Sequence, residues 1–311
     1  MPAAERTLQM YRMEKLVPLI GPSVVGPLGV VHLPRMWYKS VLSAAGMLWP
    51  DYFDNDKGLN HRVVEALGLE PDAFFAFLAT MPTYPQTEDY VKARATKLDP
   101  ESIAALNTHL LNYDKPEDRA AEVRARVGLD DPTYRNNSVL LNLEDWLAIH
   151  KALAAHRADG VEPIVPMVSS AQIGVWGVPH LPRLWFKALL NAVKALPADW
   201  KTGINCGFDK KVAKMIGLDL VAATAYIESD FPNYMQFEGW VRDHIAQPDE
   251  ATKATWTADI LGGQKAEEQG AAEVIEAGAH GLALRGTVLL NDIVDWKHMH
   301  DYVVSHRIVN A

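Results

Sequence analysis

The stretch GVVHLPRMWYK at residues 29–39 recurs with few changes as GVPHLPRLWFK at residues 177–187. The two copies lie 148 residues apart, which is nearly half of the 311-residue chain. Proline has a backbone angle close to the helical value, and it lacks only an N–H group that the first turn of a helix leaves unpaired. Each copy is therefore expected to begin a helix at its Leu-Pro pair.

Weaker similarity extends this repeat through both halves of the chain. The matched segments are 14–42 with 162–190, 58–63 with 207–212, 139–142 with 288–291, and Trp146 with Trp296. The spacing grows by one residue after the first match and by one more before the tryptophans. The pattern predicts a tandem duplication, with a first domain of residues 1–157 and a second of residues 158–311.

Helical spacing of apolar residues dominates each half, and several of the segments open with proline or close with glycine. The helices expected in the first half are 33–48, 60–67, 71–80, 86–97, 100–111, 116–127 and 143–157. Strand-like alternation is weak and is limited to stubs such as residues 139–141. We expect a mainly α fold of two tandem homologous helical domains, with few short β segments and a cleft between the halves.

Composition narrows the classes of partner. The net charge of −9 and a pI near 5.7 disfavour nucleic acid, because the field of the whole protein repels phosphates. Charges are scattered through residues 1–16, and no run approaches the roughly 18 apolar residues of a membrane span, so a cytoplasmic protein is expected. Cys206 is the single cysteine, so it has no disulfide partner within the chain. A homo-oligomer is one alternative that the sequence leaves open.

The repeated segment carries cations in an unfavourable place. Arg35 and Lys39 lie one turn apart near the start of the expected helix, as do Arg183 and Lys187. Like charges at this spacing repel each other, and cations also oppose the positive end of the helix dipole. A bound anion would reverse both effects, which predicts an anion-binding pocket in each half. The alternative is that acidic residues of neighbouring helices neutralise these cations.

A histidine precedes each of these helices, at His32 and His180. Imidazole can transfer a proton near neutral pH, although it can also act as a helix cap. Asp209 matches Asn60, so a carboxylate stands at this position in the second half alone. This difference favours the second half as the working copy.

The expected site therefore centres on the second half. Catalysis is assigned to His180, Asp209 and Lys187, and substrate binding to Arg183, Trp185, Trp176, Tyr226, His32, Arg35, Trp37 and Lys39. The aromatic members would form an apolar wall, although Trp37 and Trp185 also fit a purely core role. No metal or other cofactor is expected, because zinc-ligand spacing, the P-loop and the dinucleotide-binding motif do not occur.

The signature Gly-x-x-His-Leu-Pro-Arg-x-x-x-Lys resembles that of a bacterial family of domains of unknown function, number 5069. The resemblance continues in an acidic-aromatic segment at residues 238–241, whose first-half counterpart is residues 88–91. It implies the fold and the location of a pocket around Arg35, Lys39, Arg183 and Lys187, but no activity. Where that family tends to have Asp before the Lys, this chain has Tyr38 and Phe186, which suggests a more apolar pocket.

These residues predict an enzyme that acts on a small, partly apolar anion such as an aromatic or hydroxy carboxylate. Lyase or isomerase chemistry fits best, because abstracting a proton beside a carboxylate needs a base and fixed cations but no nucleophile. A hydrolase is the second reaction class. A non-catalytic module for small-molecule binding or assembly is the alternative from another class.

Overall fold

The computed structural model describes residues 10–52 and 58–307. These residues are mainly helical and include fourteen α-helices. The first half contains α1 (Leu33–Ala44), α2 (Leu59–Ala66), α3 (Pro71–Leu78), α4 (Tyr84–Arg94), α5 (Pro100–Leu111), α6 (Glu117–Val127) and α7 (Asn137–Ala155). The second half contains α8 (Leu181–Ala192), α9 (Gly207–Ile216), α10 (Leu220–Asp230), α11 (Tyr234–His244), α12 (Glu250–Leu261), α13 (Glu267–Glu276) and α14 (Thr287–His306), with a short 3₁₀ helix at Gly203–Asn205. Residues 1–9, which begin the charged N-terminal segment, lie outside this description.

The mainly α fold is confirmed, and the helix ends follow from local capping. Helix α4 begins two residues before its expected start, because Thr83 and Gln86 form a reciprocal capping box. Helix α7 begins at Asn137, because the side chain of Asn136 accepts a hydrogen bond from the Val139 N–H. The expected strand stub at 139–141 is therefore wrong, since these residues belong to α7. The β structure among the described residues consists of isolated bridges such as Tyr11 with Val161.

The register of the repeat also changes in the structure. Helices α7 and α14 begin 150 residues apart. The backbone hydrogen bonds made by the residues just before these helices repeat at the same spacing. The buried polar residue Asn142 therefore corresponds to Asp292, and not to Asn291 as the sequence match indicated. The spacing is 149 residues between the starts of α3 and α10 and 150 between those of α4 and α11, so the extra residue lies between these helices.

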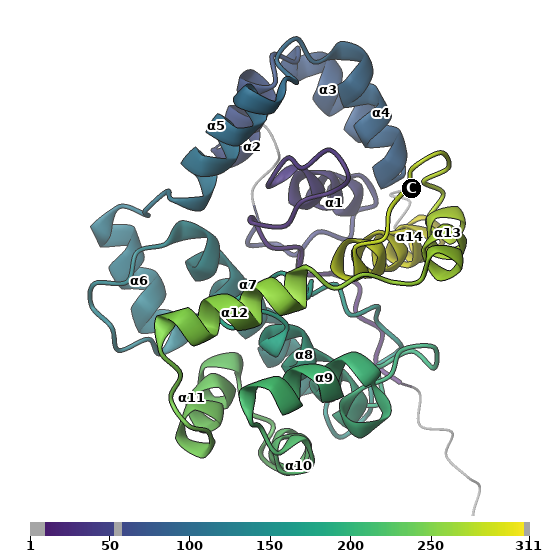
Figure 1. Cartoon of the computed structure of the whole chain (residues 1–311). Coiled ribbons are helices and arrows are strands. Elements are labelled where there is room, and N and C mark those ends of the chain that lie inside the picture. The colour runs from purple at the N-terminus through teal and green to yellow at the C-terminus, as the bar shows by residue number, and fades with distance from the viewer. Residues whose placement is uncertain (1–9, 53–57, 308–311) are drawn as a thin grey trace, which may run out of the picture.

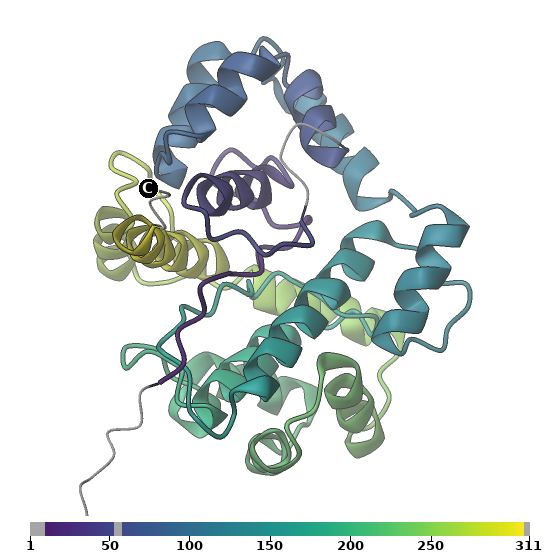
Figure 2. The same cartoon turned by 180° about the vertical axis from the view of Figure 1, so that it is seen from behind.

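The long helices at the ends of the halves pack across the middle of the molecule. Figure 1 shows α1–α5 above and α8–α11 below, with α7 and α12 running between them and α14 beside α1 and α4. Seen from behind in Figure 2, α7 crosses next to the second-half helices. Helix α7 of the first half contacts α11 of the second half. Helix α14 of the second half contacts α1 and α4 of the first half. The last helix of each half therefore packs both on its own half, against α6 or α13, and on helices of the other half.

Two matching aromatic clusters form where these helices cross. Trp296 of α14 packs in the first half, with its ring centroid 4.6 Å from that of Tyr84 and 6.2 Å from that of Trp37. Trp146 of α7 packs in the second half, at 4.5 Å from Tyr234 and 6.5 Å from Trp185. All of these rings are buried. Their burial removes a large apolar area from water and joins the halves.

One continuous group of buried apolar residues runs through both halves, from Met13 to Val303. The domain boundary near residue 157 stays a prediction, and the described core crosses it. Within the described ranges, no helix is long and apolar enough to cross a membrane.

Replacement of Trp296 by alanine should destabilise the whole chain by about 3–5 kcal/mol, because it leaves a cavity in the joint between the halves. Chemical denaturation followed by circular dichroism measures this free energy. The matched control is Trp240→Ala, because Trp240 is half-buried and stacks on Tyr226 within its own half. If Trp296→Ala lowered the free energy of unfolding no more than the control does, the contact between the halves would not depend on these rings.

Candidate functional site

The loop before each repeated helix has the same conformation in both halves. His32 and His180 adopt the left-handed backbone conformation, with φ values of 69° and 68°. Non-glycine residues adopt this conformation only at some cost, so its recurrence marks a shared, tightly specified turn. Both side chains are turned into the protein and are almost fully buried.

The two arginines of the repeated segment bind the protein itself. Arg35 donates to the carbonyl oxygens of Pro18 and Ile20, at 2.7 and 2.8 Å, and forms an ion pair with Asp145 at 2.6 Å. Arg183 repeats these contacts with Pro166, Val168 and Asp295. Both guanidinium groups are buried and neutralised, which is the alternative that the sequence left open.

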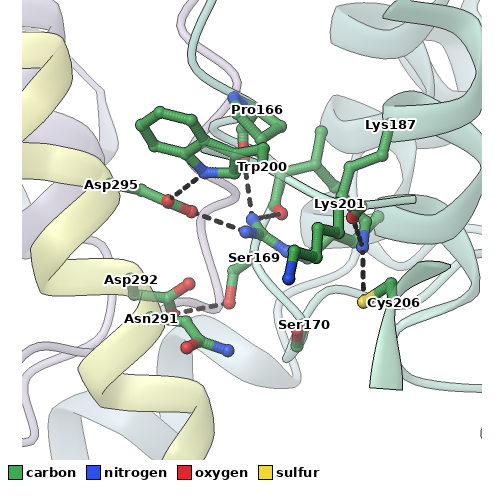
Figure 3. A network of polar contacts seen from close by, with 12 residues as sticks. Pro166, Ser169, Ser170, Lys187, Trp200, Lys201, Cys206, Asn291, Asp292 and Asp295 are labelled. Carbon is green, nitrogen blue, oxygen red and sulfur yellow. Dashed lines mark hydrogen bonds and ion pairs between the residues drawn. The ribbon is translucent and has the colours of Figure 1, made fainter. Parts of the chain in front are cut away.

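An aromatic side chain completes each arginine–aspartate pair. The Tyr52 hydroxyl donates to Asp145, and the indole N–H of Trp200 donates to Asp295 at 2.8 Å. Figure 3 shows Trp200, Asp295 and Pro166 together on one side of the second-half network, with Lys187, Lys201 and Cys206 on the other. The network is a set of mutual contacts that holds the start of α8 to α14.

The predicted catalytic residues of the second half lie together. Asp209 accepts from His180 at 2.8 Å, from Lys187 at 2.7 Å and from the Gly203 N–H at 2.8 Å. The Lys187 ammonium also contacts the Lys201 carbonyl and the Cys206 sulfur, at 3.0 and 3.3 Å. The side chains of His180, Lys187 and Asp209 are 1%, 4% and 0% exposed. A ligand cannot reach them without displacing these contacts.

The protonation states of this cluster follow from its contacts. Burial raises the pKa of Asp209, but the His180 hydrogen bond and the Lys187 charge outweigh it and hold the pKa at about 2. Burial lowers the pKa of His180 to about 4, despite its bond to Asp209. Since an ionised carboxylate only accepts, Nε2 of His180 carries the proton, and Nδ1 accepts from the Ser170 hydroxyl at 2.9 Å. His180 is therefore a neutral histidine that Ser170 and Asp209 hold in place.

The first half differs because a cavity of about 1000 Å³ opens beside the same helix start. Helices α1, α2, α6 and α7 and the segments at residues 49–52 and 113–116 line it. His32, Arg35 and Lys39 of the repeated segment reach its wall, together with Asn60. The working copy expected in the second half thus has a closed cluster, whereas the first-half copy faces open space.

At the position of Asp209, the first half has the neutral side chain of Asn60. The Asn60 carbonyl oxygen lies 2.8 Å from Nε2 of His32, so Nε2 donates and Nδ1 is unprotonated. Nδ1 is buried without a partner among the described residues, because Pro22 stands where Ser170 stands in the second half. Burial lowers the pKa of His32 to about 3, which keeps the imidazole neutral. Position 60 therefore carries no negative charge, unlike position 209.

A second lysine pair shows the same difference. Lys115 and Lys265 occupy equivalent positions, since their backbone N–H groups donate to the carbonyl oxygens of Arg135 and Arg285, respectively. The Lys265 ammonium is held by Glu273 and, at 2.6 Å, by Asn291. The corresponding first-half residues are apolar, Val123 and Leu141, and both line the cavity.

The Lys115 ammonium, as a result, has no hydrogen bond or ion pair within the described part of the chain. Burial lowers the pKa of this half-buried lysine, with further lowering from Arg126 and Arg119 and an opposing effect of Glu144. Glu144 also lines the cavity, and burial raises its pKa. Sequence reasoning missed Lys115 and Glu144, although the recurrence of Lys115 as Lys265 was a signal in the repeat.

The aromatic residues assigned to substrate binding do not gather around Arg183. Trp37 and Trp185 are fully buried in the core, and their indole N–H groups donate to the carbonyls of Pro82 and Pro232. Trp176 lines a separate hollow of about 680 Å³. Tyr226 is half-buried and stacks on Trp240. Their placement fits packing better than an apolar wall at the second-half cluster.

No family model matches the sequence, and no curated protein or solved structure matches it either. The resemblance to domain family 5069 therefore stays a prediction. Among residues 10–52 and 58–307, no group of three or more His, Cys, Asp or Glu side chains is arranged to hold a metal ion.

Asp209→Asn should change how stability depends on pH. A carboxylate whose pKa is lowered by folding stabilises the protein above its unfolded pKa, and this contribution is lost as the pH falls through the folded pKa. The wild-type protein should lose about 2 kcal/mol of unfolding free energy between pH 4 and pH 2 that the variant does not lose. Urea denaturation across this range measures the difference.

The matched control is Asp199→Asn, because Asp199 is exposed on the surface. Its pH profile should follow that of the wild type. If the profiles of Asp209→Asn and the wild type coincided between pH 4 and pH 2, Asp209 would not be held ionised by His180 and Lys187.

Proposed function

We propose that this protein binds a small organic anion, bearing a carboxylate or phosphate group, in the first-half cavity. A volume of about 1000 Å³ is within the range of small-molecule sites. Apolar side chains such as Leu59, Val123 and Leu141 supply a surface for the body of the ligand. The observation that carries the proposal is the Lys115 ammonium, which faces this cavity without the carboxylate that its counterpart has.

The charges around the cavity support an anion further. Among the described residues, its lining includes six cationic side chains and four carboxylates, in a chain whose net charge is −9. The six cations are Arg35, Lys39, Lys115, Arg119, Arg126 and Lys151, and the residues at the corresponding second-half positions are Arg183, Lys187, Lys265, Gln269, Glu276 and Asp301. Arg35, Arg119 and Arg126 form ion pairs with Asp145, Glu122 and Glu144, whereas Lys115 has no such partner among the described residues. An excess of positive charge around a concave site attracts anions.

Binding has more geometric support than proton transfer by the second-half residues. His180 and Asp209 lie in hydrogen-bond contact, as a catalytic pair would, but both are sealed from solvent. A lyase or isomerase that used them would need a large rearrangement around α8. Any chemistry on a bound anion therefore falls to the residues of the first-half cavity.

Lys115→Gln should weaken the binding of phenyl phosphate or benzoate by about tenfold or more, since it removes one charge-assisted contact. Isothermal titration calorimetry measures the dissociation constants of both probes. Lys210→Gln is the matched control, because Lys210 is an exposed lysine outside the cavity. Its affinities should equal those of the wild type.

A converse pair of variants restores the carboxylates of the second half. Asn60→Asp copies Asp209, and Val123→Glu copies Glu273. Both should reduce the affinity for the anions, because an internal negative charge would compete for the lysines. Unchanged affinity in Lys115→Gln and in Asn60→Asp, with melting temperatures near that of the wild type, would rule out this anion site.

A further inference from the structure

The environment of the Lys115 side chain differs from that of its second-half counterpart, Lys265. Lys115 lies just before α6, with Pro116, Val123 and Leu141 along the same cavity wall. In the second half, the equivalent amine is fixed by a carboxylate and an amide. In the first half, nothing among the described residues fixes the Lys115 amine, so its nitrogen can approach a bound molecule.

We propose that Lys115 forms an imine with a 2-oxo acid bound in the first-half cavity. This inference rests on the anion site proposed above. The neighbouring cations would hold the carboxylate of the oxo acid and so bring its adjacent carbonyl carbon to the lysine nitrogen.

The state of the amine favours this reaction. A lysine reacts with a carbonyl only when its nitrogen is unprotonated, and desolvation or a nearby cation increases that fraction. Burial is the main cause that lowers the pKa of Lys115, and Arg126 and Arg119 lower it further. Glu144 opposes this effect in part, but Arg126 binds Glu144 at 2.6 Å and shares its charge.

The step needs proton transfers but no other reactant. The lone pair of the Lys115 nitrogen forms a bond to the carbonyl carbon, and the carbonyl oxygen takes up a proton to become a hydroxyl group. The nitrogen then loses its protons, the C–O bond breaks, and one water leaves with the original carbonyl oxygen. The cavity is open to solvent, so water can supply the protons that the oxygen needs and take up those that the nitrogen loses.

The test is reductive trapping with pyruvate and sodium cyanoborohydride at neutral pH, followed by peptide mapping in a mass spectrometer. Lys115 should be modified at least about tenfold faster than Lys151, an exposed lysine on the rim of the same cavity. Lys151 serves as the internal control for random modification of surface amines. Equal modification of both lysines would overturn the inference.

Lys115→Arg separates the imine from the anion site, because arginine keeps the positive charge but forms no such imine. This variant should bind lactate, which lacks the carbonyl, within about threefold of the wild-type affinity and show no trapped adduct at residue 115. If lactate and pyruvate bind the wild type but Lys115 is not trapped, the imine is wrong and the anion site stands. If neither compound binds at millimolar concentration, the proposed function fails and the imine fails with it.

Discussion

The buried ion pair between Arg35 and Asp145, repeated by Arg183 and Asp295, is the interaction on which both halves depend. Removing two charges from water is costly, and additional hydrogen bonds help to recover the cost. Each arginine also donates to two carbonyl oxygens of the preceding loop. The pair therefore fixes three segments at once: the loop, the repeated helix and the long helix at the end of the half.

Around these matching ion pairs, the repeated lysines have different environments in the two halves. In the second half, Asp209 neutralises Lys187 in a cluster that is closed to solvent, and Glu273 neutralises the partly exposed Lys265. In the first half, Asn60 and Val123 replace these carboxylates, and a cavity lies beside them. A buried cation next to its carboxylate has little left to offer an external anion. At Lys115, the lysine remains without the carboxylate of its counterpart, which leaves its ammonium group able to meet an external anion.

Helix α7 contacts both halves and so couples this cavity to the second half. One face of α7 supplies Leu141, Glu144 and Ala148 to the cavity wall. Another face carries Trp146 into the aromatic cluster of the second half. The His150 ring, one turn further on, bonds the Phe231 carbonyl at 2.9 Å. The position of the wall is therefore set by packing in the second half, although the cavity belongs to the first.

The sequence by itself determined the helices and the repeated segment, because helical periodicity, proline at a first turn and capping residues act over a few neighbouring positions. It also raised the alternative that Arg35 and Arg183 are paired internally, but it could not name Asp145 and Asp295 as the partners. Those partners lie about 110 residues away along the chain, and only the fold brings them together. The tertiary structure likewise decided that the cavity lies in the first half and includes Lys115, because the difference rests on which carboxylates meet which lysines across helices.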